Sequence, residues 1–192
     1  MPEITTRAAS AETWEDVVAA MTGGGDGGSC WCQWFTMSAP EWRESRAPQR
    51  RAALEAEVVE GPPPGLVAYV DGNAAGWVRI GPRVAQGRLG RSWMRRASPT
   101  PMTDPSVWAI TCLQVRREHR RIGVTSALVA AAVEFAREHD AAAVEAYPID
   151  TAVTAVRTND LYHGAASTFL AQGFTEVARP KPARPLLVLE LR

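Results

Sequence analysis

The sequence is poor in lysine and carries no excess of either charge. Lys181 is the only lysine among 21 basic residues, and 21 acidic residues balance them, so the formal net charge is zero. A chain without a basic excess has no general attraction for nucleic acid or for an acidic membrane surface. Any site for a polyanion must therefore be local. The preference for arginine over lysine and the abundance of alanine suggest a GC-rich coding sequence and hence a bacterial protein.

Cysteines are few and long apolar runs are absent. The three cysteines, an odd number at irregular positions, argue against a secreted disulfide framework and favour a reducing compartment. No basic segment followed by an apolar run is visible at the N-terminus, so we expect no signal peptide. The most apolar stretch, 127–136, is interrupted by Glu134 and is too short to cross a bilayer. We therefore expect a cytoplasmic protein with neither a membrane nor a nucleic acid as partner.

The composition is that of one globular domain spanning residues 1–192. Hydrophobic residues make up 46% and charged residues 22% of the chain, which is typical of a protein with a core of its own. Apolar runs and alternation predict strands at 3–8, 66–70, 75–80, 107–115, 142–147, 174–178 and 186–191. Helical spacing and capping residues predict helices at 10–21, at 38–61 with a break at Pro48, at 124–139 and at 164–172.

Two stretches fit neither pattern. The segment Gly23-Gly24-Gly25-Asp26-Gly27-Gly28 predicts a loop, because glycine stabilises neither helix nor strand. Residues 82–106 carry glycine, proline and arginine without sustained periodicity. They predict a long irregular connection, and connections of that length are more often functional than accidental.

A basic turn separates the strand at 107–115 from the helix at 124–139. It reads Arg116-Arg117-Glu118-His119-Arg120-Arg121-Ile122-Gly123 and places four arginines just before a glycine-opened helix. Basic side chains at a helix N-terminus are unfavourable by about 0.3–1 kcal/mol each, so a merely solvated turn is the less favoured interpretation. The first amides of the helix attract anions at the same place. The turn therefore predicts an anion pocket, and a diphosphate suits it best.

Other phosphate-binding and nucleic-acid-binding motifs are missing. No glycine-lysine-serine/threonine sequence is present, and the dinucleotide fingerprint with its three glycines is also absent. A nucleic-acid-binding module that uses the arginine turn is disfavoured by the zero net charge and by the lack of interleaved exposed aromatic residues.

The turn and its surroundings resemble the GNAT superfamily of acetyl-CoA-dependent N-acetyltransferases. The resemblance rests on Arg120-Arg121-Ile122-Gly123-Val124-Thr125 between a strand and a long helix, and on Gln172-Gly173-Phe174 after the last helix. Cys30-Trp31-Cys32 and Glu145-Ala146-Tyr147-Pro148 look like a bacterial subgroup of that superfamily. The resemblance implies an α/β (α+β) fold, a mixed and mostly antiparallel central sheet of about seven strands with helices on both faces.

The family pattern implies acetyl-CoA as co-substrate and no metal. The backbone of residues 113–115 would pair with the pantetheine arm like an extra strand, and the backbone around residues 121–126 would hold the pyrophosphate. The implied coenzyme-binding residues are Leu113, Gln114, Val115, Arg120, Arg121, Ile122, Gly123, Val124, Thr125 and Ser126. The family usually has glycine or alanine where Thr125 stands, so the hydroxyl alters or supplements one phosphate contact.

The implied reaction is direct acetyl transfer to an amine in a ternary complex, which requires a base and benefits from an acid. Glu145, on the strand after the long helix, is the candidate base, although an edge or surface glutamate is an equally good interpretation. Phe169 stands where many members have the tyrosine that protonates the departing thiolate. Tyr162 and His163 are the candidate replacements, although His163 is equally suited to a capping role and the thiolate can also leave unprotonated.

Cysteine, histidine and tryptophan side chains have simpler interpretations. Cys112 lies within an apolar strand and is expected to be a buried structural thiol rather than an acyl-accepting nucleophile. Cys30 and Cys32 are too few, at the wrong spacing, for a zinc site. The tryptophans beside them are interpreted as core anchors, with the wall of an acceptor pocket as the alternative. His119 is assigned to phosphate binding rather than to proton transfer.

The amine acceptor is a small molecule or a protein amine, bound by the irregular segments 23–42, 83–106 and 149–163, and a homodimer is compatible with the sequence. One different class of function stays open. A non-catalytic acyl-CoA-binding sensor on the same fold is favoured by Phe169 and Thr125. Turnover of acetyl-CoA with an amine distinguishes the enzyme from the sensor.

Overall fold

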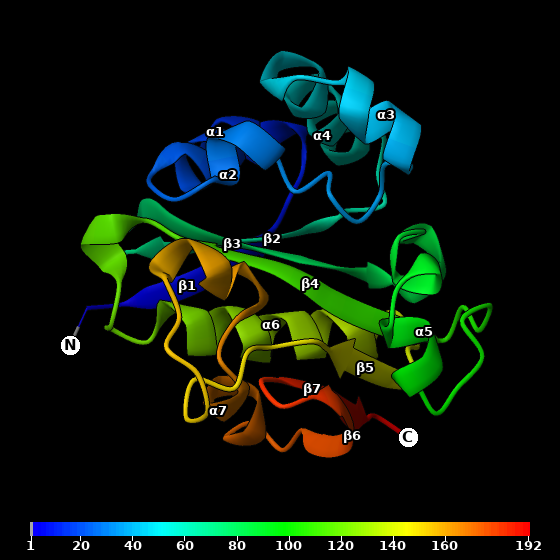
Figure 1. Cartoon of the computed structure of the whole chain (residues 1–192). Coiled ribbons are helices and arrows are strands. Elements are labelled where there is room, and N and C mark those ends of the chain that lie inside the picture. Colours follow the sequence, from blue (N-terminus) through cyan, green and yellow to red (C-terminus); the bar gives the residue numbers. More distant parts are fainter. Residues whose placement is uncertain (1) are drawn as a thin grey trace.

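A seven-stranded mixed sheet organises the chain. The computed structural model describes residues 2–192, without the side chains of residues 158 and 159. The strands lie in the order β1-β2-β3-β4-β5-β7-β6. Within the described residues, β4 and β5 are parallel and the other neighbouring pairs are antiparallel. The predicted fold, a mostly antiparallel sheet of seven strands with helices, is confirmed (Figure 1).

Most predicted elements are present with small shifts at their ends. The strands are β1 (Ile4–Ala8), β2 (Gly65–Val70), β3 (Asn73–Pro82), β4 (Val107–Val115), β5 (Ala143–Ala146), β6 (Thr175–Lys181) and β7 (Arg184–Glu190). The α-helices are α1 (Trp14–Thr22), α2 (Gly27–Cys30), α3 (Ala39–Glu44), α4 (Ala47–Glu60), α5 (Met94–Ala97), α6 (Val124–Glu138) and α7 (Ala166–Leu170). The last hairpin is tighter than predicted because β6 continues to Lys181 and β7 already begins at Arg184. Helix α1 begins at Trp14 rather than at residue 10, because Ala11–Thr13 form a 3-10 helix before it.

Helices cover both faces of the sheet because its central strands are apolar on both. In β2, Leu66, Ala68 and Val70 belong to the core cluster that contains α6, whereas Val67 and Tyr69 belong to the cluster that contains α1 and α4. This assignment follows from the alternation of side chains along a strand. Figure 1 shows α1, α2, α3 and α4 above the sheet and α6 and α7 below it.

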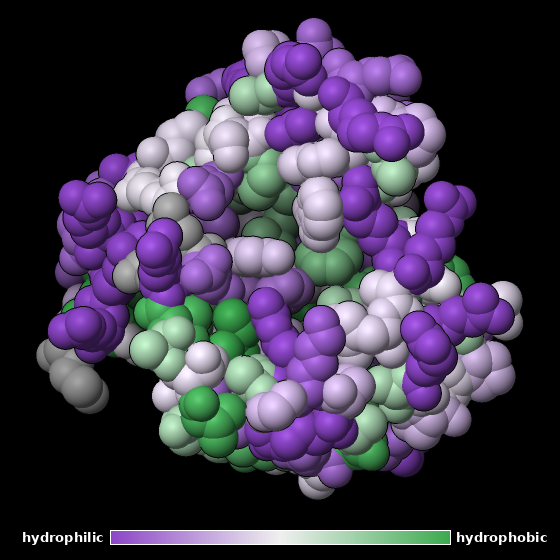
Figure 2. All heavy atoms as spheres, in the orientation of Figure 1, coloured by the Kyte–Doolittle hydropathy of each residue, from purple (hydrophilic) through white to green (hydrophobic). Residues whose placement is uncertain are grey.

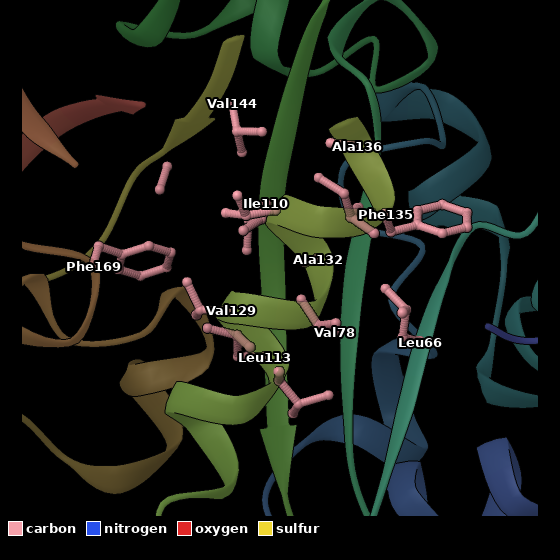
Figure 3. Close-up of a cluster of buried hydrophobic side chains, with 14 of the residues drawn as sticks. Leu66, Val78, Ile110, Leu113, Val129, Ala132, Phe135, Ala136, Val144 and Phe169 are labelled. Atoms are coloured by element: carbon pink, nitrogen blue, oxygen red, sulfur yellow. The ribbon is translucent and has the colours of Figure 1, made fainter. Parts of the chain in front are cut away.

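Helix α6 anchors the lower layer. Val124, Leu128, Ala132, Phe135 and Ala136 follow one another at helical spacing, and all five are buried. Figure 3 shows part of this cluster, in which α6 side chains pack against strand residues and against Phe169 from α7. Full burial of each large aliphatic or aromatic side chain contributes about 1.5–3 kcal/mol, so the packed stripe fixes the start of α6 against β4. Among the described residues, no helix has both the length and the apolar character needed to cross a membrane.

The helices before β2 begin largely as their sequence signals predict. Ser38 and Glu41 form a capping box at α3, in which the Ser38 amide donates to Glu41 Oε2 at 2.7 Å. Pro48 lies in the first turn of α4, where a missing amide hydrogen is tolerated, and α4 ends at Gly61.

The prediction of a loop across the whole glycine-rich segment is wrong at its end, because α2 includes Gly27 and Gly28. A Cβ on Gly27 would lie 2.3 Å from the Met21 carbonyl oxygen. Glycine therefore lets this single turn of helix lie against the end of α1.

The connection between β3 and β4 is irregular, as predicted, but it is not unstructured. It contains two short 3-10 helices, Arg83–Ala85 and Leu89–Arg91, followed by α5. Arg83 and Gln86 are buried polar residues within it. The segment is therefore folded against the sheet rather than projecting into solvent.

Strands β4 and β5 separate halfway along β4. Their parallel pairing ends at Ile110 and Ala146, and the chain after β5 bridges instead from Ile149 to Ala165. On the other side, the register with β3 shifts at Thr111, because Arg79 faces Cys112 while Ile80 faces Ile110. An extra residue of this kind is a β-bulge, which bends a strand and increases its twist. The bend and the separation together leave an opening beside the second half of β4.

Candidate active site

The basic turn after β4 presents unbonded amides to the opening. Arg121 and Gly123 have φ angles of +64° and +99°, which curl the backbone just before α6. No side chain caps α6, and the Ala127 amide is bonded to the Gly123 carbonyl at 3.0 Å. The amides of the first turn therefore point outward without a side-chain partner, which is the arrangement that binds an anion.

The four arginines of the turn do different things. Arg116 is bound internally, because its Nη1 donates to the Ala19 carbonyl at 2.8 Å and its Nε donates to Glu118 Oε1 at 2.7 Å. Arg120 donates through Nε to the Val115 carbonyl at 3.1 Å and also lines the opening. Arg117 and Arg121 line the opening and, among the described residues, make no side-chain hydrogen bond or ion pair. Two arginines are thus free for an anion.

The opening is a cavity of about 520 Å³, here called the β4 slot. Its walls come from β4, the basic turn, the start of α6 and the segment before α7. A second hollow of about 280 Å³ lies at the start of α6. Together the two contain every sequence-predicted coenzyme residue except Ile122, namely Leu113, Gln114, Val115, Arg120, Arg121, Gly123, Val124, Thr125 and Ser126. His119 also lines the second hollow, whereas the Ile122 side chain is 41% exposed.

One edge of β4 faces the slot with its backbone. Residues Leu113–Val115 pair with residues 76–78 of β3, whereas the β4 ladder to β5 has already ended at Ile110. An unpaired strand edge presents a row of amide and carbonyl groups that bind an extended chain by adding to the sheet.

Tyr162 stands at the junction of the hollows on this face. It lines the β4 slot, a cavity of about 530 Å³ on its other side, and a smaller apolar cavity of about 310 Å³. Burial raises the pKa of its phenol, while the positive charge of Arg184 acts in the opposite direction. The hydroxyl therefore stays protonated at neutral pH.

His163 lies beside Tyr162 and is more deeply buried. The two rings stack with their centroids 4.1 Å apart. Burial, and then the charge of Arg184, lower the pKa of His163 to about 3, although a hydrogen bond to the Thr111 backbone acts in the opposite direction. The imidazole is consequently neutral at physiological pH and its Nδ1 has no hydrogen-bond partner. It lines the 530 Å³ cavity and not the β4 slot.

Glu145 is not brought together with Tyr162 and His163. Its side chain is 1% exposed and its Oε1 lies 2.7 Å from Arg83 Nη1. Ser98 donates to Oε1 and Tyr147 donates to Oε2, each at 2.5 Å. Both oxygens are therefore occupied, and the residue lines none of the three cavities around Tyr162.

Phe169 is fully buried and does not line the slot. Its ring packs edge to face on Phe174 with centroids 5.3 Å apart. A Cβ on Gly164 would lie 2.8 Å from Phe169 Cε2 and 2.9 Å from Leu113 Cδ1. Glycine at this position therefore brings the segment before α7 close to β4, with Phe169 filling the space behind it.

The 530 Å³ cavity, here called the cationic pocket, is walled by the segments Trp34–Ala39 and Gly87–Met94, with Tyr162 and His163 at its inner end. Parts of all three predicted acceptor segments thus meet at one cavity. Lys181 and Arg184 of the last hairpin also line it, and sequence reasoning missed them because the hairpin carries no local motif. Figure 2 shows the hollow between the helices at the top of the molecule and the part below them that carries α5.

The 310 Å³ cavity contains all three thiols. Cys30, Cys32 and Cys112 line it together with Trp34 and Tyr162, so Trp34 is a pocket wall while Trp31 is a buried core residue. The indole of Trp77 donates to Cys32 Sγ at 3.3 Å. Burial raises the pKa of Cys30 to about 11. Within the part of the chain that the structure describes, no group of three potential metal ligands is present.

Some residues of the β4 slot carried no clear signal. Gly25 and Asp26 line it from the glycine-rich loop, which lies against the basic turn because the Arg117 amide donates to the Gly23 carbonyl at 3.2 Å. Leu161, Gly164, Ala165 and Thr168 line it from the segment around α7. The sequence predicted the segment 23–42, which contains Gly25 and Asp26, as part of the acceptor pocket.

The described fold agrees with a family comparison. The model of the acetyltransferase (GNAT) family matches residues 31–164 of this chain. The chain belongs to the GNAT acetyltransferase family. The predicted identification is thereby confirmed, and this GNAT acetyltransferase is an enzyme whose co-substrate is acetyl-CoA. A search of curated proteins gives no match.

Solved structures share the fold of this GNAT acetyltransferase at low sequence identity. PaiA N-acetyltransferase from Thermoplasma acidophilum, in complex with coenzyme A, is 13% identical, with a TM-score of 0.54 and coverage of 98% of this chain and 99% of that chain. An N-acetyltransferase from Staphylococcus aureus Mu50 is 12% identical, with a TM-score of 0.56 and coverage of 99% of both chains. Diaminobutyrate acetyltransferase EctA from Paenibacillus lautus is 13% identical, with a TM-score of 0.52 and coverage of 99% and 96%.

Proposed function

We propose that this GNAT acetyltransferase transfers acetyl from acetyl-CoA directly to the amine of a small molecule, with Tyr162 between the two substrates. The observation that carries the proposal is that Tyr162 lines both the β4 slot and the cationic pocket. A coenzyme in the slot and an amine in the pocket would meet at this side chain. Direct attack in a ternary complex requires that the amine and the thioester lie next to each other, as they would at Tyr162.

The residues of the slot fit the parts of coenzyme A. The free guanidinium groups of Arg117 and Arg121 and the uncapped amides at the start of α6 suit the pyrophosphate. The unpaired edge of Leu113–Val115 suits the amides of the pantetheine arm. The Thr125 hydroxyl lines both hollows and adds one donor.

In the transfer step the nitrogen of the neutral amine bonds to the thioester carbon, the carbon–sulfur bond breaks, the nitrogen loses one proton as the amide forms, and the thiolate receives one. We assign the proton that the thiolate receives to the Tyr162 hydroxyl, which is neutral and half-buried where the substrates meet, and the proton released by the nitrogen restores that hydroxyl. His163 touches Tyr162 and positions it. The Phe169 ring supplies no proton, so the acid has moved along the chain relative to many family members.

The attacking amine must lose its proton before it reacts. Glu145 remains the sequence-predicted base, but Arg83, Ser98 and Tyr147 already occupy its oxygens. We favour a different route, in which the positive charges of the cationic pocket lower the pKa of a bound ammonium group. The same effect of Arg184 on His163 supports this route. The proton then leaves to solvent through the open pocket.

Small-molecule acceptors are favoured over protein amines. Diaminobutyrate acetyltransferase was solved with L-2,4-diaminobutyric acid, and an agmatine N-acetyltransferase is also among the structural neighbours. The cationic pocket has the size of a metabolite site, since cavities of about 300–1,000 Å³ hold small molecules.

The proposal is tested by two-substrate kinetics of thiol release. Intersecting initial-rate lines are expected for direct transfer in a ternary complex, whereas parallel lines would show an acyl-enzyme and overturn the mechanism. Tyr162→Phe should lower kcat by about 10²-fold or more while the Kd of acetyl-CoA changes little. Tyr69→Phe is a matched control, because the Tyr69 hydroxyl donates to Asp16 on the α1 side of the sheet and lines none of these cavities.

A further inference from the structure

Cations predominate in the wall of the cationic pocket. Arg88, Arg91, Lys181 and Arg184 line it, and among the described residues of its wall Glu41 is the only carboxylate. Glu41 is a capping residue whose Oε2 accepts a hydrogen bond from the Ser38 amide. His163 adds no charge, because its pKa of about 3 keeps the imidazole neutral. A pocket for an amine is thus lined by cations, which repel an ordinary ammonium group.

Three of these cations have no partner of their own. Arg88 is fixed, since its guanidinium lies 3.9 Å from the centroid of the Trp34 ring and donates to the Met37 carbonyl at 3.1 Å. Among the described residues, Arg91, Lys181 and Arg184 make no side-chain hydrogen bond or ion pair.

Arg179, in the same hairpin, has acidic partners. Arg179 binds both Asp150 and Glu176, each at 2.8 Å or less. Among the described residues, the hairpin thus pairs Arg179, which does not line the pocket, and leaves Lys181 and Arg184, which do line it, without a partner. Converging cations without counter-charges are the arrangement that recognises an oxyanion on a ligand.

Arg184 also lies close to the expected reaction centre. Its charge acts on both Tyr162 and His163, the two residues at the inner end of the pocket. Arg91 and Lys181 are exposed, whereas Arg184 is half-buried. The three cations therefore extend from the mouth of the pocket toward Tyr162. A ligand with an oxyanion at one end and an amine at the other matches that layout.

We infer that the acceptor is an acidic amine, a small molecule that carries a carboxylate or phosphate group held by Arg184, Lys181 and Arg91 while its amine faces Tyr162. This inference rests on the proposed function and names the acceptor class for the same site. Attraction between the oxyanion and the cations lets the acceptor bind, although the same cations still disfavour the protonated form of its amine. Trp34, Phe35 and Trp93 supply apolar walls for the carbon skeleton between the two groups.

The test uses pairs of amines that differ only in the anion. Each of a set of L-amino acids is compared with its carboxamide, and O-phosphoethanolamine is compared with ethanolamine, with thiol release from acetyl-CoA as the readout. We expect the acidic member of at least one pair to have a kcat/KM about tenfold or more above its neutral partner. Comparison of the amino acid pairs with the phosphoethanolamine pair shows whether the pocket recognises a carboxylate or a phosphate. Equal or better use of the neutral partners, or of polyamines, would overturn the inference.

Variants locate the effect. Arg184→Gln should raise the KM for the acidic acceptor about tenfold and bring the preference for the acidic member close to one, with kcat changed less than KM. Arg96→Gln is the matched control, since Arg96 is exposed, has no side-chain partner among the described residues and does not line the pocket. An unchanged preference in Arg184→Gln, with a melting temperature like that of the wild type, would contradict the assignment.

Binding separates a failure of this inference from a failure of the proposed function. If no amine in the panel is acetylated while acetyl-CoA still binds, the proposed transfer fails. The acidic compounds are then judged by the melting temperature of the coenzyme A complex, which they should raise in the wild type and not in Arg184→Gln. The absence of any such shift would overturn the acidic-ligand site.

Discussion

Arg83 and Glu145 form an ion pair that is closed to solvent, with Nη1 2.7 Å from Oε1 and side chains that are 0% and 1% exposed. Arg83 also donates to Ser98 and to the Pro101 carbonyl, while Glu145 accepts from Ser98 and Tyr147. Burial and the Glu145 charge raise the pKa of Tyr147 well above its usual value, so its hydroxyl stays a donor. The pair joins the β3–β4 connection to β5.

Glu145→Gln should therefore act on stability more than on catalysis. Removing one partner of a buried ion pair leaves an unpaired charge and costs about 3–5 kcal/mol. Urea unfolding should show this loss, while kcat at a temperature where the variant is folded stays within a few-fold of wild type. The double variant Arg83→Met/Glu145→Leu should recover much of the stability. A variant of native stability whose kcat falls by about 10²-fold would instead identify Glu145 as the base.

Neutralising Arg121 should weaken coenzyme binding without unfolding the protein. A charge-assisted hydrogen bond contributes about 1.5–3 kcal/mol, so Arg121→Gln should raise the Kd of acetyl-CoA by about 10- to 100-fold. The loss should shrink as salt is added, because the contact is partly exposed. Isothermal titration calorimetry measures both effects, with Arg96→Gln as control. The same Kd in both variants would remove the arginine turn from the coenzyme site.

His163 should make the fold sensitive to mild acid. Its pKa is about 3 in the folded protein against 6.5 for an ordinary histidine, chiefly through burial. Between these values the unfolded chain binds a proton that the folded protein does not, so stability falls as the pH drops below about 6.5 and is fully present above it. His163→Gln lacks this contribution. The decline of the unfolding free energy between about pH 7 and pH 4.5 should thus be shallower in the variant, and parallel curves would contradict the assigned pKa.

Substitutions at Gly164 and Gly72 distinguish the effect of backbone strain from that of steric crowding. Gly164 and Gly72 both have positive φ, +76° and +79°, but only Gly164 has neighbours that a Cβ would strike. Gly72→Ala should cost about 1–2 kcal/mol and leave the Kd of acetyl-CoA unchanged. Gly164→Ala should cost more and also raise that Kd, because the new methyl group pushes on Leu113 beside the slot. Equal effects of the two variants on binding would show that Leu113 does not shape the slot.

The sequence predicted most of the fold because its signals were local. The capping box at Ser38 and the apolar stripe of α6 each act within a few residues. The candidate coenzyme residues lie together around the β4 slot and the hollow at the start of α6 because the basic turn and the helix start are contiguous, while their role in binding stays a prediction.

The acceptor side was not predicted in full because it depends on contacts between distant segments. Nothing near Glu145 in sequence shows that Arg83 will be its partner. Nothing near Lys181 shows that its hairpin folds beside Tyr162. The helix over Gly27 and Gly28 was missed because its stability comes from packing on α1 rather than from glycine's own preference.

Gln86 connects the two halves of the active site mechanically. It lies in the β3–β4 connection, yet its side-chain amide donates to the Ala109 carbonyl at 3.0 Å and its carbonyl accepts from Thr111 at the bulge of β4. Arg88 and Arg91, which line the cationic pocket, belong to the same connection. A chimera that takes this segment from another family member to change the acceptor would also lose the two hydrogen bonds between Gln86 and β4. Under the proposed function, the choice of acceptor therefore cannot be changed by exchanging this segment alone. The replacement segment must also supply a side chain that hydrogen-bonds to β4 at the bulge, as Gln86 does.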